Sequence, residues 1–446
     1  MSDKLISTIS GMRGIIGKTL FPENALLAGK AYGAYVRGRR VVVGGDSRTS
    51  HLMLKSALIS GLIASGCEVV DIGICPTPTI EMAILGCGAH GGVGITASHN
   101  PIQWNGLKFF NSRGEFLTPK QYENFSKFLN SGDPAIRNWD KLGSISADLS
   151  WNERHVDAVC KLALVNPALI RKSKFKVVID GVNGGGSIPG PMLLEKLGCR
   201  VMRINCIPDG HFPHNPEPVP GNLKMLGEAV VASKADIGFA VDPDADRLAI
   251  VDGHGNPIGE EYTLAICADY VLSKRPGNMV INLSSSNLNA DVCQRHKSKL
   301  HLAKVGEANV VDLMRRRKAV IGGEGNGGVI LPDLHYGRDS LVGMALILQH
   351  MAQSGKSIAQ LAYSIGEYVI VKSKGNLTPQ FELKLTRLQK KLSSQKITTV
   401  DGVRVDFNNG WVHIRKSNTE PIYRLIAEAR TRKEANSLIK FIREKL

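Results

Sequence analysis

Short runs of aliphatic and β-branched residues recur through the sequence, and each run leads into a turn rich in Gly, Asp or Ser. These runs lie at 41–48, 176–186, 237–247, 279–286 and 319–328. Between them, stretches such as 52–66 place apolar residues at helical spacing and stop near a glycine. Alternating strands and helices predict an α/β protein with largely parallel strands, because parallel neighbours require a crossover connection.

The polar turn residues directly follow the expected strands. In sheets of this type, ligands bind at the loops beyond the carboxyl ends of the strands. Since each run is followed by a loop and then by a helical stretch, we expect the functional site to be assembled from several strand-to-helix loops.

Turn-rich segments divide the chain into four parts. Residues 131–144 have the composition of a linker, and further junctions are expected near 251–261 and around 371–379, after which the chain becomes more basic. Each part has the size of an ordinary domain. The four expected domains are residues 1–145, 146–252, 253–370 and 371–446.

The composition is that of an ordinary soluble protein, because 43% of the 446 residues are apolar, 22% are charged and 6% are aromatic. It excludes a disordered chain, a collagen-like repeat and a small disulfide-stapled scaffold. The eight cysteines form no Cys-x-x-Cys pair, so we expect small buried hydrophobes in a reducing compartment. No signal-peptide core and no apolar stretch of membrane-spanning length is found, which predicts a cytoplasmic protein.

The charge balance points to an anionic partner. The chain carries 56 Lys and Arg against 40 Asp and Glu, a formal charge of +16. The basic residues form short clusters at 37–40, 171–176 and 315–318, and no recognisable nucleic-acid-binding motif accompanies them. We therefore expect a small phosphorylated molecule, with neither nucleic acid nor membrane as a partner.

Segment 91–110 contains a strand-like run followed by a polar turn that presents Ser98. This serine could act as a nucleophile or phosphoryl carrier, with Lys108 supplying charge and His99 transferring a proton. A turn in which polar residues only cap a helix fits the same pattern.

Three alternate carboxylates, Asp242, Asp244 and Asp246, also follow a strand-like run. They can converge on one hard cation, and they repel one another unless a metal or an arginine neutralises them. An EF-hand is excluded because Arg247 and Gly253 stand where it requires Gly and Glu. A phosphatase of the haloacid dehalogenase type, with Asp242 as nucleophile, and a solvated acidic turn are the alternatives.

A glycine-rich turn at 322–328 contains one carboxylate, Glu324. Glycines allow a close approach of the backbone to a ligand, while Glu324 and Asn326 could bind sugar hydroxyls. Glycine-rich turns without a function are equally common.

The segment 415–421 follows a strand-like run and is dense in hydrogen-bond donors. Its Arg415 and hydroxyl side chains suit a phosphate or carboxylate, especially if a helix begins there. An ordinary helix cap is the alternative.

Taken together and in this order, the four segments resemble those of the α-D-phosphohexomutase superfamily. They stand here as TASHNP at 96–101, DPDADR at 242–247, GEGNGG at 323–328 and RKSNTEP at 415–421. The GMRG segment with Arg13, GHFPHNPEP at 210–218 and KVGEANV at 304–310 extend the resemblance over essentially the whole chain. It implies three similar α/β domains and a smaller C-terminal α+β domain around a central cleft.

The resemblance also implies a role for each motif residue. The implied ligands of one Mg²⁺ per chain are Ser98, which carries the phosphate, and Asp242, Asp244 and Asp246. The residues implied around the transferring phosphoryl group are Arg13, His99, Lys108 and Arg247. The residues implied in binding the sugar and its second phosphate are Glu324, Asn326, Arg415, Ser417, Asn418 and Thr419.

Within the superfamily, the chain is most similar to bacterial phosphoglucosamine mutases with a GEGNGG loop. The expected reaction interconverts glucosamine 6-phosphate and glucosamine 1-phosphate through a phosphoserine enzyme and a sugar 1,6-bisphosphate, which also serves as activator. Many members carry Ser and His where this chain has Asn326 and Gly328, and we expect Gly328 to leave room for the sugar.

Other activities are kept as alternatives. The same motifs are also compatible with phosphomannomutase or phosphoglucomutase activity, which is the second hypothesis. A phosphatase, or a phosphate-binding protein without catalysis, would be a protein of a different functional class. The resemblance is compatible with a monomer or a homodimer.

Overall fold

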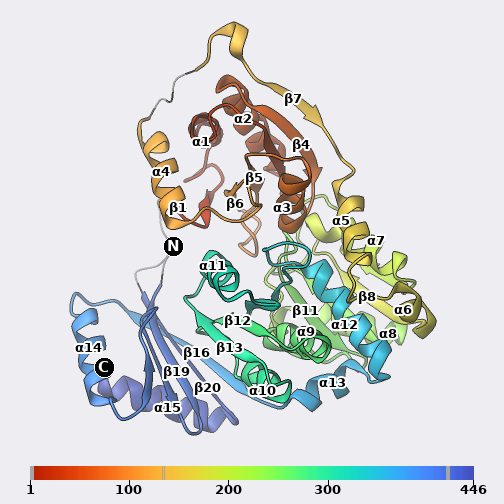
Figure 1. Ribbon diagram of the computed structural model, residues 1–446, viewed down its shortest axis with the longest axis vertical. Helices are drawn as coiled ribbons and strands as arrows, with labels where there is room; N and C mark the ends of the chain where they lie inside the picture. Colours follow the sequence, from red (N-terminus) through yellow and green to blue (C-terminus); the bar gives the residue numbers. More distant parts are fainter. Residues whose placement is uncertain (1–4, 133, 135, 418–421) are drawn as a thin grey trace.

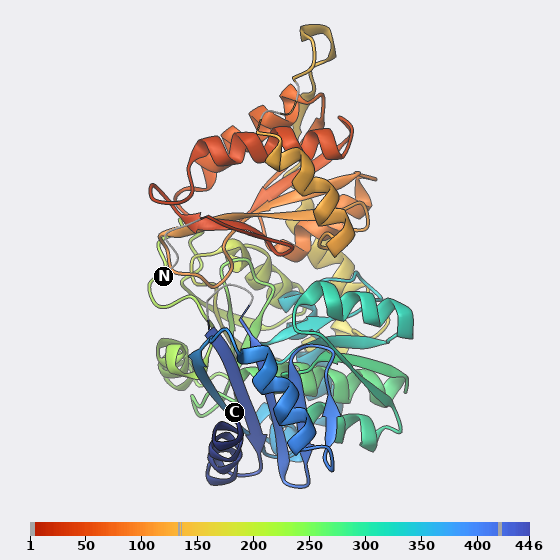
Figure 2. The same ribbon diagram turned by 90° about the vertical axis from the view of Figure 1, so that its left-hand side faces the viewer.

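Four β-sheets follow one another along the chain in the computed structural model, which describes residues 5–132, 134, 136–417 and 422–446 (Figure 1). The first sheet, with its helices, lies above the other three, and the C-terminal sheet lies beside the second and third (Figure 2). No helix in this described part of the chain is long and apolar enough to cross a membrane.

The first sheet has seven strands and helices on both faces. Its strands are β1 (Ile6–Thr8), β2 (Gly11–Ile15), β3 (Val41–Gly45), β4 (Glu68–Ile74), β5 (Gly91–Ile95), β6 (Trp104–Asn111) and β7 (Ser144–Ala147), in the order β1-β2-β6-β5-β3-β4-β7. Its helices are α1 (Pro22–Tyr35), α2 (His51–Ala64), α3 (Thr77–Gly86) and α4 (Pro119–Asn130). The buried side chains of α1, α2 and α4 share one apolar core, and those of α3 share another.

The second and third sheets have four strands each. The second comprises β8 (Lys176–Asp180), β9 (Arg200–Ile204), β10 (Ile237–Val241) and β11 (Leu248–Asp252), in the order β11-β10-β8-β9. The third comprises β12 (Asn278–Asn282), β13 (Lys299–Ala303), β14 (Ile321–Glu324) and β15 (Gly328–Ile330), in the order β13-β12-β14-β15. Their helices are α5 (Trp151–Cys160), α6 (Pro167–Ser173), α7 (Pro189–Lys196), α8 (Lys224–Ser233), α9 (Glu260–Lys274), α10 (Leu288–Arg295), α11 (Glu307–Arg317), α12 (Ser340–Ser354) and α13 (Ile358–Ile365).

One continuous apolar core joins the second and third sheets, and α12 lies within it. This helix is apolar on nearly every side, as a fully buried helix must be. It begins where the Asp339 side chain accepts hydrogen bonds from the Leu341 and Val342 N–H groups, and it ends at Gly355 in the left-handed conformation.

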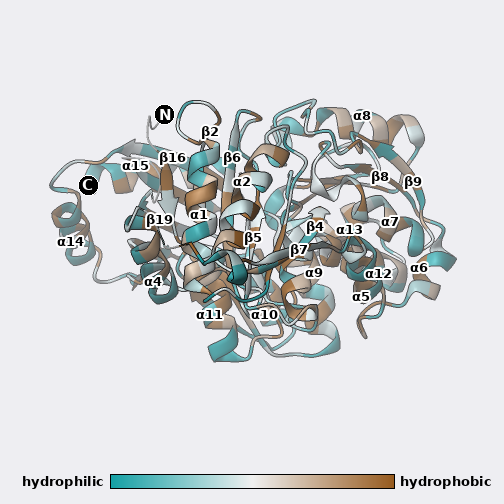
Figure 3. Cartoon of the chain, turned by 90° about the horizontal axis from the view of Figure 1, so that it is seen from above, coloured by the Kyte–Doolittle hydropathy of each residue, from teal (hydrophilic) through white to brown (hydrophobic). Residues whose placement is uncertain are grey.

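The C-terminal sheet is antiparallel throughout, and its order is β16-β20-β19-β18-β17. Its strands are β16 (Val369–Asn376), β17 (Lys396–Thr398), β18 (Val403–Phe407), β19 (Gly410–Lys416) and β20 (Ile422–Ala429), and its helices are α14 (Phe381–Lys391) and α15 (Arg432–Lys445). Apolar residues occupy one face of each helix and form a separate core against the sheet (Figure 3). Strand β16 covers most of 371–379, where the sequence indicates a junction.

The expectation of largely parallel strands is correct for β5-β3-β4-β7, β10-β8-β9 and β13-β12-β14. It is wrong for the C-terminal sheet and for β1 and β2, since β2 pairs antiparallel with both β1 and β6. It is also wrong for β6, β11 and β15. Each of these strands runs antiparallel to the strand before it, β5, β10 and β14 respectively. The reason is the length of the connection, because 96–103, 242–247 and 325–327 are too short for a crossover helix. The motifs are therefore loops between antiparallel neighbours, and 417–421 likewise connects β19 to β20.

All eight cysteines are free, and Cys67, Cys75, Cys199, Cys267 and Cys293 are buried. The other three are half-buried. The sequence prediction of small apolar cysteines is thus confirmed for most of them.

Candidate active site

Ser98 lies three residues beyond β5, at the bottom of a tightly held loop. Its backbone adopts the left-handed conformation, with φ of 50°, which is uncommon for a non-glycine residue. The Ser98 N–H donates to the Thr96 hydroxyl at 2.9 Å, and that hydroxyl donates to the Asp46 carboxylate at 2.6 Å. The loop is therefore fixed by polar contacts on the side away from the solvent.

A buried arginine, Arg48, completes this support. It forms an ion pair with Asp46 at 3.2 Å. Its guanidinium donates, at distances of 2.6 to 2.9 Å, to the carbonyl oxygens of Ser98, Asn100, Pro101 and Trp104. Sequence reasoning missed both residues, although a carboxylate and an arginine two positions apart after β3 were a usable signal.

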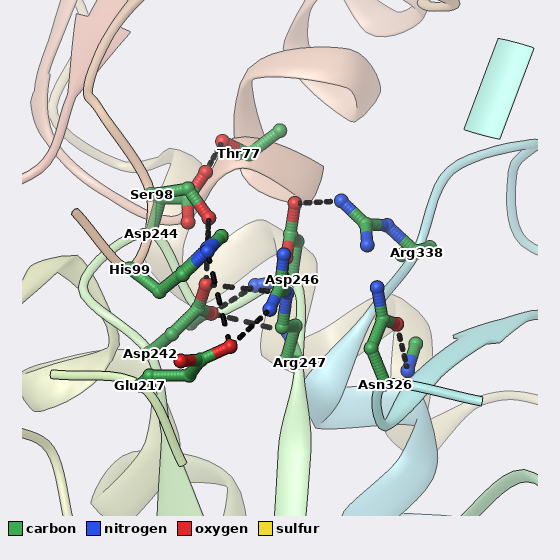
Figure 4. A network of polar contacts seen from close by, with 12 residues as sticks. Thr77, Ser98, His99, Glu217, Asp242, Asp244, Asp246, Arg247, Asn326 and Arg338 are labelled. Atoms are coloured by element: carbon green, nitrogen blue, oxygen red, sulfur yellow. Dashed lines mark hydrogen bonds and ion pairs between the residues drawn. The ribbon is translucent and has the colours of Figure 1, made fainter. Parts of the chain in front are cut away.

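The three aspartates of the second motif converge beside Ser98 (Figure 4). Asp242, Asp244 and Asp246 are buried, and one oxygen of each lies within 4.8 Å of the others. The Ser98 hydroxyl donates to Asp242 Oδ2 at 2.9 Å. Asp244 Oδ1 and Asp246 Oδ1 are buried without a hydrogen-bond partner among the described residues. Buried, unpartnered carboxylate oxygens at this spacing fit a hard divalent cation.

The charges at this point are strongly coupled. Burial raises the pKa of Asp242, and the neighbouring Asp246 and Asp244 raise it further. Burial would also raise the pKa of Asp244, but Lys108 lowers it well below the ordinary range. Lys108 Nζ lies 2.5 Å from Asp244 Oδ2, and Thr77 donates to the same oxygen at 2.6 Å. Thr77, on α3, is a further residue that the sequence analysis did not single out.

His99 and Arg247 lie on the solvent side of the aspartates. His99 Nδ1 lies 3.3 Å from Ser98 Oγ. Burial and the charges of Arg247 and Arg13 lower the pKa of His99 to about 2, so its imidazole is neutral near pH 7. Arg247 Nε lies 3.9 Å from Asp242, and its Nη1 lies 3.7 Å from Glu217, in the 210–218 segment.

Glu324 and Asn326 lie on the third motif loop, next to Arg338. The Glu324 carboxylate accepts hydrogen bonds from Asn282, from the Gly306 N–H and from Arg338, at 2.8 to 3.1 Å. The expectation that Gly328 leaves open space is wrong, because a Cβ at this position would overlap the Arg338 side chain.

The fourth motif contributes Arg415 and Ser417. Arg415 Nε donates to Asp401 at 3.1 Å. On the neighbouring strand Arg424 pairs directly with Arg415. Both arginines line the cavity, so two cations lie side by side at this part of its wall. Arg424 was not among the predicted residues, and the predicted Asn418 and Thr419 lie outside the described part of the chain.

One cavity of about 740 Å³ brings the motifs together. Every sheet, together with its loops, contributes to its wall. The predicted residues that line it are Arg13, Ser98, His99, Lys108, Arg247, Glu324, Asn326, Arg415 and Ser417. Asp242, Asp244 and Asp246 lie directly behind Ser98 and Lys108. The cavity thus places a serine hydroxyl and several cations in front of a carboxylate cluster, an arrangement suited to binding a phosphoryl group.

Sequence models of known families match four successive parts of this chain. They describe phosphoglucomutase/phosphomannomutase alpha/beta/alpha domain I at residues 5–134, domain II at 153–255, domain III at 260–368 and the C-terminal domain at 381–445. The chain belongs to the phosphoglucomutase/phosphomannomutase family. The resemblance to the α-D-phosphohexomutases and the expected architecture are both confirmed.

Individual proteins are similar to this phosphohexomutase over nearly its full length. A phosphoglucomutase/phosphomannomutase of Thermococcus kodakarensis is 39% identical, and the match covers 98% of this chain and 97% of the relative. A probable phosphoglucosamine mutase of Methanopyrus kandleri is 36% identical, with 96% and 95% covered. The crystal structure of a phosphoglucomutase/phosphomannomutase family protein from Burkholderia thailandensis superposes with a TM-score of 0.87 at 28% identity, with 99% and 98% covered. The chain is therefore an enzyme, a phosphosugar mutase.

Proposed function

We propose that this phosphohexomutase interconverts glucosamine 6-phosphate and glucosamine 1-phosphate. The observation that carries the proposal is the contact between the Ser98 hydroxyl and Asp242 at 2.9 Å, in a cavity to which the loops of all four sheets contribute. A serine held against a carboxylate cluster and surrounded by cations suits a phosphoryl carrier.

In the proposed reaction, Ser98 begins as a phosphoserine. A sugar hydroxyl oxygen bonds to its phosphorus while the bond between phosphorus and Ser98 Oγ breaks, which gives the sugar 1,6-bisphosphate. The bisphosphate then turns over, and Ser98 Oγ takes the other phosphoryl group. The attacking hydroxyl loses its proton as the new bond to phosphorus forms, and Ser98 Oγ gains a proton as it leaves, so the step balances. His99 is neutral near pH 7, and a pKa of about 2 makes its imidazole a weak base, so its proposed part is hydrogen bonding beside Ser98 rather than removal of the proton.

The cations and carboxylates have separate tasks. Arg13, Lys108 and Arg247 line the cavity and can neutralise the oxygens of the transferring group. Asp242, Asp244 and Asp246, with the Ser98 phosphate, would hold one Mg²⁺ per chain. When bound, Mg²⁺ adds positive charge at the phosphoryl oxygens and helps to orient them.

The second phosphate of the substrate is assigned to the C-terminal domain. Because one phosphoserine serves both ends of the sugar, the phosphate that is not reacting must be bound at the same place in both orientations. Arg415 and Ser417 line the cavity and supply the donors for it, and Asn418 and Thr419 extend this motif.

Removal of this phosphate contact should affect both directions of the reaction equally. Arg415→Ala is expected to lower kcat/KM by about 30- to 150-fold for glucosamine 6-phosphate and glucosamine 1-phosphate alike, the effect of one charge-assisted contact. Steady-state kinetics in both directions, with Ser98 phosphorylation followed by intact mass, test this. A loss confined to one substrate would mean two distinct phosphate sites. Arg432→Ala, an exposed arginine at the start of α15, is the control.

Glucosamine is the preferred sugar in this proposal because its protonated amino group is a cation. The Glu324 carboxylate at the cavity wall attracts an ammonium group more strongly than the hydroxyl that glucose and mannose carry at the same carbon. The name of the Methanopyrus relative agrees with this choice. Phosphomannomutase or phosphoglucomutase activity is the second candidate, and the name of the Thermococcus relative favours it.

Substrate competition decides between the two candidates. We expect kcat/KM for glucosamine 6-phosphate to exceed that for glucose 6-phosphate by about tenfold, the effect of one modest ionic contact, with mannose 6-phosphate lower still. Coupled assays of the three sugars measure this directly. A preference for mannose would overturn the choice of sugar but not the mutase mechanism, whereas steady release of inorganic phosphate would indicate a phosphatase.

The activator, the compartment and the oligomeric state of the enzyme are also part of the proposal. We propose that a sugar 1,6-bisphosphate serves as activator, and that the enzyme acts in the cytoplasm as a monomer or homodimer. Its partner is the small phosphosugar, and neither nucleic acid nor a membrane takes part. The domain division at 145, 252 and 370 is retained as part of the same proposal.

A further inference from the structure

Arg338 lies between β15 and α12 and reaches into the same cavity. Its guanidinium donates to three carboxylates, namely Asp246 at 2.6 Å, Glu307 at 2.9 Å and Glu324 at 3.1 Å. Asp246 belongs to the metal-binding motif and Glu324 to the sugar-binding motif. One side chain therefore connects the loop that faces the reacting phosphoryl group with the loop that faces the sugar.

We propose that Arg338 is a positioning residue of the mutase reaction, one that fixes the distance and orientation between the metal-binding loop and the sugar-binding loop. This inference rests on the proposed function of the same cavity. An arginine keeps its charge at all relevant pH values, so it serves geometry rather than proton transfer. Its planar group fixes the directions of its bonds to three carboxylates, whereas the donors of a lysine ammonium rotate freely and fix no such directions.

The loop that carries Arg338 is itself anchored on both sides by buried groups. His335 Nδ1 lies 3.1 Å from Glu81 Oε2 of the first domain. Asp339 Oδ2 lies 2.8 Å from His155 Nε2 and 3.1 Å from His335 Nε2. These contacts connect three domains. Because the nitrogen and oxygen atoms of these four side chains contact one another directly, we interpret them as a hydrogen-bonded anchor for the loop that carries Arg338.

Gly328 leaves the space that the Arg338 side chain occupies. It lies in β15 with a backbone conformation that any residue can adopt, so glycine is not required there by its φ angle. A Cβ at this position would nevertheless overlap Cδ of Arg338 and approach its Cγ to 2.9 Å. The neighbouring arginine can move aside only by disturbing its bonds to three carboxylates, which hold its guanidinium. The structure thus explains Gly328 by the space that Arg338 occupies.

The first test replaces Arg338 by lysine, which keeps the charge and removes the planar group. Glu324 retains its bonds to Asn282 and the Gly306 N–H, so the sugar should still bind. We expect kcat to fall by about 10- to 100-fold, as for a small misalignment of reacting groups, with Kd for glucosamine 6-phosphate changed by less than about threefold. A purely structural role would lower the melting temperature and would not separate kcat from Kd in this way. Arg316→Lys, at an exposed arginine with one carboxylate partner, is the matched control.

The second test is a double-mutant cycle between positions 328 and 338. Its first variant, Gly328→Ala, leaves every buried charge in place. Gly328→Ala should lower kcat by about tenfold or more in the wild-type background, because the added methyl group displaces Arg338. In the Arg338→Ala background the same change should cost less than about twofold, since the overlap is gone. Gly221→Ala, at a glycine with open space around it, is the control.

The outcomes separate this inference from the proposed function. A wild-type protein without mutase turnover would overturn the proposed function. An active wild type whose Arg338→Lys variant keeps full kcat would overturn the positioning role alone. An equal loss on Gly328→Ala in both backgrounds would show that Gly328 serves another purpose, and the connection to Arg338 would be refuted.

Discussion

Replacing Ser98 by alanine is expected to lower kcat by at least about 10⁴-fold, because the variant has no oxygen to carry the phosphoryl group. The expectation follows from the position of the hydroxyl, 2.9 Å from Asp242 Oδ2 and at the wall of the cavity. The loop should keep its shape, since Arg48 holds it through backbone carbonyl oxygens rather than through the serine side chain. A coupled mutase assay and the melting temperature measure the two effects.

Intact mass provides the second measurement on Ser98. Wild-type protein incubated with glucose 1,6-bisphosphate should gain the mass of one phosphate, and Ser98→Ala should not. Ser437→Ala is the matched control, because Ser437 is exposed on α15 and its hydroxyl donates to the Lys433 backbone carbonyl of the same helix. Retained turnover in Ser98→Ala would exclude the serine as phosphoryl carrier.

The sequence located the site more accurately than it predicted the topology. Ser98, Asp242, Glu324 and Arg415 were found because each lies at the end of an apolar strand or just beyond it, next to a short polar loop, a pattern visible within ten residues. The direction of the following strand was not visible in this way. A strand that returns antiparallel after a short loop has the same apolar run as one that continues after a helix, so β6, β11 and β15 were not anticipated.

The supporting residues were missed because their partners lie far away in the sequence, and only Asp46 and Arg48 left a local signal. Arg48 acts on a loop 50 or more positions away, and Thr77 contacts Asp244 across 167 positions. Arg338 contacts Asp246 across 92 positions and fills the space beside Gly328. No motif at Thr77 or Arg338 indicates the contact, because these partners meet only when separate domains are packed together. The mistaken expectation of open space at Gly328 has the same cause.

Asp244→Asn is expected to lower kcat by about 10³-fold, the upper range for the loss of one preorganised electrostatic contact. Asp244 Oδ2 is bonded to Lys108 at 2.5 Å and to Thr77 at 2.6 Å, while its Oδ1 has no partner among the described residues and is available to a metal. An amide removes one negative charge from the cluster and leaves Lys108 with a weaker partner. The affinity for Mg²⁺ should fall with kcat, and calorimetric titration of the metal-free protein with Mg²⁺ measures it independently of turnover.

The metal itself can be tested in the wild-type protein alongside this variant. Excess chelator should abolish turnover, and added Mg²⁺ should restore it. The reason is that the cation held by the buried carboxylates neutralises charge on the phosphoryl oxygens. Asp312→Asn is the matched control, since Asp312 is exposed on α11 and pairs with the exposed Arg316. Full activity in chelator would show that Lys108, with Arg247, Arg13 and Arg338, supplies enough positive charge alone. The three aspartates would then serve to hold Lys108 and Arg338 in place rather than to bind a metal.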